Sequence, residues 1–434
     1  MRTIVKLLSV LVLATLTFQA PAGAGDDIPG YRSSDNLELV HQVAPGTGGT
    51  DIEFFTRELR RWFDADGVEH IIDEEDPPVT RHFAVVGNQN TGPKIVDITE
   101  PEIAYQVSAM PSCRPSQGDV QIHPDGMLVG LAKQGGTCTL PGGGAAPHGA
   151  ILVDVSDVYA PEVISVASAP RGAHNITFTP DGNYVYVSES GDSPGQIPIY
   201  DISDPATPRK IKDWAMPSGD SPHDIRLSED GTRAYGAGID QFRIFDTTDP
   251  ENPSVIVTFT VPGSTIGHDT LITPDKRFLF AGDEMNGGGT APCPGGAIYV
   301  YDLLDETSPE LIGIVEAESG PVTGRNVTEA FVGSIGGCTS HVMDLNPDKM
   351  SLTIGWYVSG LRTFDFSGLY DAQGNPSPSP SLRWGSLGVG PVLEDGWLVG
   401  DGGSTWSAKQ YSEVPGYIFA DDRNLGLLVV KITE

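Results

Sequence analysis

Apolar and polar residues alternate along short β-rich runs throughout the chain, and the same arrangement returns at intervals. Each clear copy has a β-rich run that ends in an aspartate, then a turn, then a second β-rich run. The copies are KIVDITEPEIAYQV (94–107), ILVDVSDVYAPEVISV (151–166), PIYDISDPATPRKIKDW (198–214), RIFDTTDPENPSVIVTF (243–259) and YVYDLLDETSPELIGIV (299–315). An aspartate accepts hydrogen bonds from turn amides and proline fixes φ, so each copy predicts a β-hairpin.

The first half of the repeating unit is also a hairpin. It is built around Pro-Asp-Gly or a close variant, which favours a tight turn between two strands. The copies are DVQIHPDGMLVGLA (119–132), HNITFTPDGNYVYVS (174–188), HDIRLSEDGTRAYGA (223–237), HDTLITPDKRFLFAG (268–282) and HVMDLNPDKMSLTIG (341–355). Two hairpins in series give four antiparallel strands in a unit of about 45–55 residues, which is typical of a propeller blade.

The number of units predicts an all-β fold, a seven-bladed β-propeller of four-stranded blades. TDIEFF (50–55) opens the first blade and STWSAKQY (404–411) opens the last. Blades two to six open at residues 118, 174, 223, 268 and 341. The last blade lacks a fourth strand of its own, and NLELVHQV (36–43) is similar to the outer strands of other blades. We therefore expect this N-terminal segment to complete blade seven and to close the ring.

The domain organisation follows from the same pattern. Residues 1–24 have a positively charged start, an apolar run and a small-residue cleavage site, which indicates a signal peptide. The apolar run is too short to span a bilayer comfortably, which disfavours a membrane anchor. Residues 25–434 are expected to form one propeller domain. Two segments break the repeat: an insertion in blade one (56–79) and a Pro/Ser-rich excursion before blade seven (367–390).

Composition and charge narrow the function classes. The chain has a formal net charge of −32, and removal of residues 1–24 leaves 24 basic against 58 acidic side chains, a charge of −34. Such a surface repels nucleic acid and anionic lipid. No later stretch is long and apolar enough to predict a membrane span. We therefore expect a secreted protein, extracellular or associated with the cell surface, whose partner is an extracellular ligand or surface component, and we expect a monomer.

The cysteines fit this exported context. The four residues are Cys113, Cys138, Cys293 and Cys338. An even number in an exported protein predicts disulfides. Three connectivities are open, and the repeat register favours Cys113–Cys138 and Cys293–Cys338.

The VDITEP, VDVSD and YDISDP hairpins resemble the LVIVD repeat of a family of bacterial secreted and surface propellers. The resemblance covers about residues 36–434. It implies a propeller fold and export but no particular activity, because the family has no single established one. The HxIxxxPDG hairpins are also similar to those of YVTN-type, lactonase-like and selenium-binding propellers, although the CSSC-type segment of the selenium-binding proteins is absent.

Four histidines occupy the same place in four successive blades. His174, His223, His268 and His341 each stand seven residues before the aspartate of the tight turn. This place opens the innermost strand, so we expect the imidazoles at one mouth of the central channel. Imidazole nitrogen binds zinc, copper or iron, which makes these residues candidate metal ligands. The alternative is structural: a histidine here bonds backbone groups between blades, and repetition copies it.

Other side chains are expected on the same face, on inner strands and on the loops between second and third strands. Two of these loops are long, at 133–150 and 283–297. Rigid scaffolds carry function on such loops. The candidate binding-face residues are Asp51, Asp119, Asp224, Asp269, Glu189, Asp283, Glu284, Trp356 and Trp406. For each residue alone, solvation or packing is the alternative interpretation.

Two functions from different classes remain open. The first is an exported binding module that recognises a glycan, peptide or small molecule at the upper face, by which we mean the end of the propeller where the four histidines are expected. The second is a metal-dependent hydrolase or oxidoreductase, with a transition metal (zinc, copper or iron) as its cofactor. A lactonase-like propeller that uses carboxylates and calcium is a third. No GxxxxGK[ST] motif is present, and no Ser-His-Asp triad can be assembled from the spacing, so the sequence names no catalytic residue and leaves open whether the protein is an enzyme.

Overall fold

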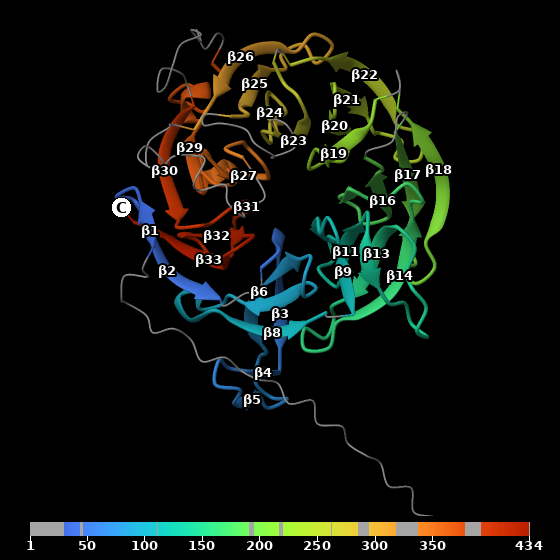
Figure 1. Ribbon diagram of the computed structural model, residues 1–434, viewed down its shortest axis with the longest axis vertical. Helices are drawn as coiled ribbons and strands as arrows, with labels where there is room; N and C mark the ends of the chain where they lie inside the picture. Colours follow the sequence, from blue (N-terminus) through green and yellow to red (C-terminus); the bar gives the residue numbers. More distant parts are fainter. Residues whose placement is uncertain are drawn as a thin grey trace, which may run out of the picture.

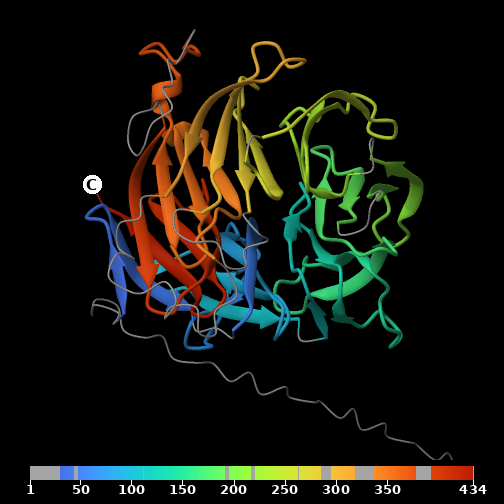
Figure 2. The same cartoon turned by 45° about the horizontal axis from the view of Figure 1, so that its top comes forward.

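Antiparallel sheets surround a common axis in the computed structural model, which describes residues 30–433 except 44–46, 111, 191–194, 217–219, 262, 285–294, 318–336 and 378–391. Seven of the sheets are blades, six with four strands and one with five (Figure 1). The predicted all-β, seven-bladed propeller is therefore confirmed. Figure 2 shows the blades side by side, each turned against its neighbours.

Each blade runs from an inner strand near the axis to an outer strand at the rim (Figure 1). Blade one contains β3 (Gly49–Leu59), β6 (Val79–Asn88), β7 (Lys94–Asp97) and β8 (Tyr105–Ala109). Blade two contains β10 (Val120–Ile122), β11 (Leu128–Lys133), β13 (Gly149–Asp154) and β14 (Glu162–Ser168). Blade three contains β15 (Asn175–Phe178), β16 (Tyr184–Ser188), β17 (Gln196–Asp201) and β18 (Arg209–Ala215). Blade four contains β19 (Pro222–Leu227), β20 (Arg233–Gly238), β21 (Phe242–Asp246) and β22 (Ser254–Phe259).

The remaining blades complete the circle. Blade five contains β23 (Gly267–Ile272), β24 (Phe278–Asp283), β25 (Ile298–Asp302) and β26 (Glu310–Val315). Blade six contains β27 (Met343–Asn346), β28 (Ser351–Gly355), β29 (Leu361–Asp365), β30 (Leu393–Gly400) and β1 (Tyr31–Ser33). Blade seven contains β31 (Thr405–Gln410), β32 (Tyr417–Asp422), β33 (Gly426–Ile432) and β2 (Leu37–Val43). Short 3₁₀ turns lie at Pro101–Ile103, Pro347–Lys349 and Ser367–Leu369.

The aspartates of the repeat make the turns that the sequence predicts. In each turn a carboxylate oxygen accepts a hydrogen bond from the amide two residues later. The pairs are Asp97–Thr99, Asp154–Ser156, Asp201–Ser203, Asp246–Thr248, Asp302–Leu304 and Asp365–Ser367. Turn capping therefore explains the recurring aspartate without a bound calcium ion.

The ring closes where the two ends of the described chain meet. β2 pairs with β33, with Leu37 opposite Ile432 and Val43 opposite Leu427, which confirms the strand predicted from NLELVHQV. A second N-terminal strand was not predicted: β1 pairs with β30 and adds a fifth strand to blade six. Both pairings cover a strand edge that would otherwise be free to pair with another chain.

The core lies between the blades. At the seam between the last and first blades, Phe419 and Val429 pack with Ile52 and Ala84, all nearly inaccessible to solvent. Burial of a side chain the size of Val, Ile or Phe contributes about 1.5–3 kcal/mol. The seam is therefore an apolar contact of the same kind as those between other blades.

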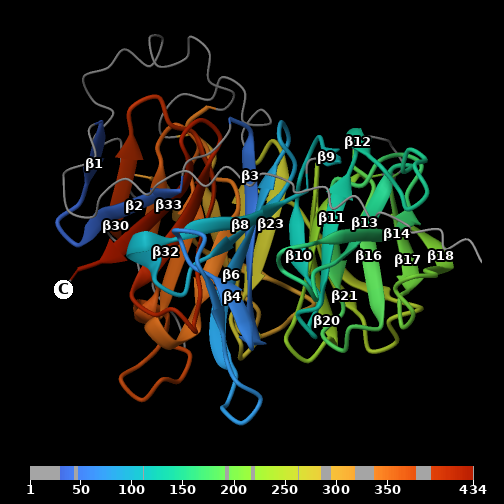
Figure 3. The ribbon, with the colours of Figure 1, turned by 90° about the horizontal axis from the view of Figure 1, so that it is seen from below.

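Two small hairpins lie at opposite ends of the ring (Figure 3). β4 (Arg61–Phe63) and β5 (Glu69–Ile71) extend from the long inner strands of blade one. β9 (Cys113–Pro115) and β12 (Gly136–Cys138) lie at the other end, and the expected Cys113–Cys138 disulfide joins them. Cys293 lies outside the described residues, so its pairing with Cys338 stays a prediction. Within the described parts of the chain, no helix is long and apolar enough to cross a membrane.

Candidate functional site

One position opens the inner strand of every blade, and we call it the ring position. Its occupants are Thr50, Gly118, His174, His223, His268, His341 and Trp406. In four blades the pairing of the inner strand slips at this position. The slips fall between Gly49 and Ile52, Pro222 and Asp224, Gly267 and Thr270, and Thr405 and Ser407. A bulge of this kind redirects side chains, so that successive residues such as His223 and Asp224 are both buried near the axis.

The four histidines form a continuous arc of rings, which we call the imidazole arc. The ring centroids lie 4.2 Å apart for His174 and His223, 4.3 Å for His223 and His268, and 3.9 Å for His268 and His341. The arc continues to Trp406, whose ring lies 4.2 Å from that of His341. The structure therefore brings together all four predicted histidines and one predicted tryptophan.

Hydrogen bonds fix which nitrogen is free in three of the four rings, those of His174, His223 and His341. Nδ1 of His223 lies 2.9 Å from the backbone oxygen of His268, and Nδ1 of His341 lies 2.8 Å from that of Trp406. A carbonyl oxygen only accepts, so each Nδ1 carries the proton and each Nε2 keeps a lone pair. Nδ1 of His174 makes the corresponding bond to the amide oxygen of Gln134, at 2.9 Å. These bonds between blades are also what the structural interpretation of the histidines predicts.

Burial keeps the imidazoles neutral. It lowers the pKa of His174 to about 4. It lowers the pKa of His223, His268 and His341 well below the ordinary value, and the neighbouring imidazoles lower it further. A neutral imidazole has a lone pair on its unprotonated nitrogen. A row of such rings can therefore bind a cation or accept hydrogen bonds.

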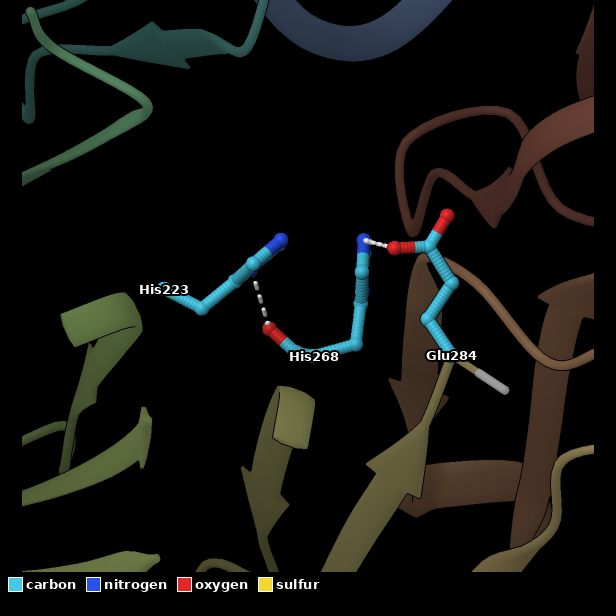
Figure 4. A group of neighbouring side chains, drawn as sticks. All are labelled: His223, His268 and Glu284. Atoms are coloured by element: carbon cyan, nitrogen blue, oxygen red, sulfur yellow. Dashed lines mark hydrogen bonds and ion pairs between the residues drawn. The ribbon is translucent and has the colours of Figure 1, made fainter. Parts of the chain in front are cut away.

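A carboxyl group lies beside this arc. Glu284 follows the end of β24, and its Oε1 accepts a 2.5 Å hydrogen bond from the hydroxyl of Tyr357. Nε2 of His341 lies 3.7 Å from Oε1, and Nε2 of His268 lies 4.0 Å from Oε2. Figure 4 shows the His223 and His268 rings side by side, with the Glu284 carboxyl next to His268. Burial raises the pKa of Glu284 to about 7.

Tyr357 is held in an unusual backbone conformation. Its φ is +40°, a left-handed value that is rare for a residue with an aromatic side chain. Its amide donates to the backbone oxygen of Thr405, and the Thr405 amide donates back. These paired bonds place the phenol ring 4.6 Å from the His341 ring. Strain of this kind clusters at functional sites and persists only where the surroundings impose it.

The guanidinium of Arg423 is the last side chain of this site. Arg423 is 8% exposed and lies over the Trp406 ring, 4.5 Å from its centroid. Burial lowers the pKa of Arg423. Sequence analysis missed this residue, although Arg423, Glu284 and Tyr357 each directly follow the second strand of a blade or come two residues after it. We call the imidazole arc together with Trp406, Tyr357, Glu284 and Arg423 the axial site.

Four predicted carboxylates lie below the arc and hold the blades together. Asp119 accepts from the amide of Ile176 and Asp269 from that of Met343, in each case a residue of the next blade. Nε of Arg226 lies 3.2 Å from Asp269 and 3.4 Å from Asp224. Burial raises the pKa of Asp224 to about 7, against the opposing effect of Arg226.

The fourth of these carboxylates, Asp51, lies 2.9 Å from Nζ of Lys409, which also contacts Glu53 at 2.8 Å. Arg226 and Lys409 stand three residues after the ring position. Extending the repeat register by three residues would have found both in the sequence.

Three predicted binding-face residues lie apart from the axial site. Trp356 is fully buried in an apolar cluster with Phe278 and Phe364. One oxygen of Asp283 accepts from Ser264, Thr265 and Ile266 and so fixes a loop. Glu189 accepts from the amide of Arg171, and burial raises its pKa.

No family model and no curated protein sequence matches the chain, so the resemblance to LVIVD-repeat propellers stays a prediction. Solved structures do match. A functionally unknown protein from Desulfotomaculum acetoxidans is 15% identical with a TM-score of 0.51, over 87% of this chain and 98% of that one. Hydrazine synthase from Kuenenia stuttgartiensis is 14% identical with a TM-score of 0.54, over 80% and 92%.

The β-propeller domain of Cps50 (Swd1) from Myceliophteria thermophila is 12% identical with a TM-score of 0.55, over 92% of this chain and 100% of that one. Likenesses at this identity concern the fold. A β-propeller fold supports a binding or scaffold function in general, and any particular ligand has to be argued from the site.

Proposed function

We propose that this protein is an exported propeller that binds a small extracellular ligand at the axial site. The observation that carries the proposal is the unbroken row of rings from His174 to Trp406, with Glu284, Tyr357 and Arg423 beside it. Ligand sites combine aromatic walls with a few convergent polar groups. The axial site offers these elements on a rigid ring of sheets.

Export rests on separate observations. The first 24 residues have the pattern of a signal peptide. The Cys113–Cys138 disulfide is typical of proteins that fold in an oxidising compartment. The resemblance of the repeated hairpins to the LVIVD repeat of secreted and surface propellers points the same way.

Burial limits the size of the ligand. His223, His268 and His341 are each at most 4% exposed, and Trp406 is partly exposed. An ion or a small organic molecule reaches such groups more easily than a glycan chain or a folded peptide. Of the ligand classes that the sequence left open, the site therefore favours a small molecule.

A thermal-shift screen of small organic acids, amines, phenols and sugars tests the proposal. We expect at least one compound to raise the Tm of the wild-type protein and of Trp214→Leu, but not of Trp406→Leu. Trp214 is a matched control because it packs on Phe245, in the outer part of the blades. The proposal fails if no compound shifts the Tm, or if Trp406→Leu responds like the wild type.

A metal-dependent hydrolase or oxidoreductase is the second candidate. It is favoured by three buried donor groups, on His223, His268 and Glu284, whose ligand atoms lie within 4.8 Å of one another. Turnover of activated esters, or of phenols with dioxygen, by protein loaded with zinc, copper or iron would support it. Turnover that persists in a His223→Ala/His268→Ala variant would count against it.

A further inference from the structure

We propose that Nε2 of His223, Nε2 of His268 and a carboxylate oxygen of Glu284 bind one divalent first-row transition metal ion. The ligand atoms of these three residues all lie within 4.8 Å of one another, and all three residues are buried. Metal bonds to imidazole and carboxylate are about 2.0–2.2 Å long, so ligand atoms around one ion lie roughly 3–4 Å apart. Small side-chain rotations bring the three atoms to that spacing.

The bonds behind two of the three ligands, His223 and Glu284, suit this role. Nδ1 of His223 donates to the backbone oxygen of His268, which orients the ring and leaves Nε2 for the ion. Tyr357 donates to Oε1 of Glu284 and leaves Oε2, the oxygen 4.0 Å from Nε2 of His268. Hydrogen bonds from ligands to backbone carbonyls and to neighbouring polar groups are the usual outer support of metal sites.

His268 differs from its neighbours at Nδ1. Among the described residues, Nδ1 of His268 is buried without a hydrogen-bond partner, although the same atom of His223 and of His341 has one. No hydrogen bond therefore fixes the tautomer of His268, and its Nε2 is free to present a lone pair to an ion.

The geometry selects three ligands from the larger set that the sequence suggests. His341 lies nearer Oε1, the carboxylate oxygen that Tyr357 already occupies. His174 meets His223 edge to face, on the side away from His268, and is less buried than the other three histidines. Within the described chain, these two histidines flank the ligand group without belonging to it.

Three protein ligands leave a coordination position open, as in catalytic rather than structural metal sites. Two imidazoles and one carboxylate suit zinc, iron or copper(II), and the group has no sulfur ligand that would select copper(I). The inference rests on the proposed function, because the open position faces the place where a small ligand would bind. An anionic or nitrogen-containing small molecule is then the ligand class that the site favours.

Metal content of the exported protein, prepared without a polyhistidine tag, is the test. After removal of metal with a chelator, we would titrate Zn(II) against a chromophoric chelator and record the visible absorption of the Co(II) form. We expect about one ion per chain. Affinity should fall at least 100-fold in His223→Ala and His268→Ala, and at least 10-fold in Glu284→Gln, which can keep the bond from Tyr357.

His41→Ala is the matched control and should bind metal like the wild type, because His41 is a buried histidine outside the axial site whose Nε2 bonds the backbone oxygen of Ala104. Circular dichroism would confirm that each variant is folded, and Glu284→Gln provides a nearly isosteric variant if an alanine variant does not fold. The inference is overturned if the wild type binds no ion, or if His41→Ala loses the ion as completely as His268→Ala. It is also overturned if Glu284→Gln binds with wild-type affinity.

The result is separable from that of the ligand screen. If metal-free protein binds small ligands at Trp406 but no ion, this inference fails and the proposed function stands. If the protein binds an ion through these residues but no small ligand, the inference stands and the proposed function fails.

Discussion

The blades that carry histidine at the ring position and those that do not are linked to their neighbours by the same kind of hydrogen bond. The donor side chain differs between these two halves of the ring. In blade one, the hydroxyl of Thr50 donates to the backbone oxygen of Gly118, in the next blade, at 2.8 Å. In blade four, Nδ1 of His223 donates to the backbone oxygen of His268, again in the next blade, at 2.9 Å. The donors occupy the same ring position and link neighbouring blades in the same way.

This comparison shows that joining blades does not require histidine. A threonine makes the bond with far less volume and without a second nitrogen. Gly118, in the blade after Thr50, has no side chain because its φ of +80° suits glycine and an added Cβ would lie 2.7 Å from the Thr50 hydroxyl oxygen. The structural interpretation therefore accounts for the Nδ1 bonds of His174, His223 and His341, and it makes no use of Nε2.

Below the ring position the two halves are alike. Arg226 neutralises Asp224 and Asp269 on the side of the imidazole arc, and Lys409 neutralises Asp51 and Glu53 on the other side. The deeper layer is thus a structural feature of the whole axis. The asymmetry, and with it the proposed binding, belongs to the layer at the ring position.

The largest effect should come from removal of one of the deep cations. Arg226→Met leaves Asp224 and Asp269 buried without their ionic partner, and we expect the free energy of unfolding to fall by about 4 kcal/mol. Chemical denaturation measures this loss. The control is Arg209→Met, which removes an exposed pair with Asp201 and should cost less than about 1 kcal/mol. Equal losses in the two variants would show that the deep layer has no special role.

A smaller effect should appear as a dependence of the free energy of unfolding on pH. Burial raises the pKa of Asp344 to about 6, partly opposed by Lys409 and Arg226 and reinforced by Glu53. The native state then holds a proton between about pH 4 and pH 6 that the unfolded state has lost, so this group's contribution to stability is lost as the pH rises through that window. Asp344→Asn does not titrate.

The stability of Asp344→Asn relative to wild type should therefore increase by about 3 kcal/mol between pH 4 and pH 7. Urea unfolding at a series of pH values measures the difference. A constant difference across this range would mean that the Asp344 carboxyl titrates normally.

The smallest effect tests the comparison between the halves directly. Thr50→Val and His223→Phe each remove one bond between blades and leave a buried carbonyl unsatisfied, so both should lose about 1 kcal/mol of stability. Only His223→Phe should also lose bound Zn(II). If Thr50→Val lost the ion to the same extent, metal binding would depend on the stability of the ring and not on the imidazole.

Much of the fold could be predicted because its signals are local and repeated. The Asp-containing turns, the Pro-Asp-Gly turns and the strand alternation each occupy a few successive residues, and their repetition from blade to blade reinforces the signal. Closure of the ring could also be predicted, because Leu37–Val43 has the pattern of the other outer strands. β1 has only three residues and no such pattern, so its place on blade six was not predicted.

The site was predictable only as far as the repeat register reaches. The register placed the four histidines in one arc, since equivalent positions of successive blades are neighbours in a ring. It could not separate Trp356 from Trp406, since the side of a strand that each ring packs against depends on bulges and turns. Trp356 lies in the core between blades, and Trp406 lies in the bulge at the axis.

The sequence by itself determined the number of blades, the turns, the closing strand and the circular order of the ring positions, because each follows from short-range patterns and their repetition. Only the tertiary structure decided which nitrogen is free in three of the four imidazoles, which carboxylates are engaged between blades, and that Glu284, Tyr357 and Arg423 meet beside the arc. Those facts depend on distances of a few ångströms between residues far apart in the chain, which packing of whole blades sets and no local pattern encodes.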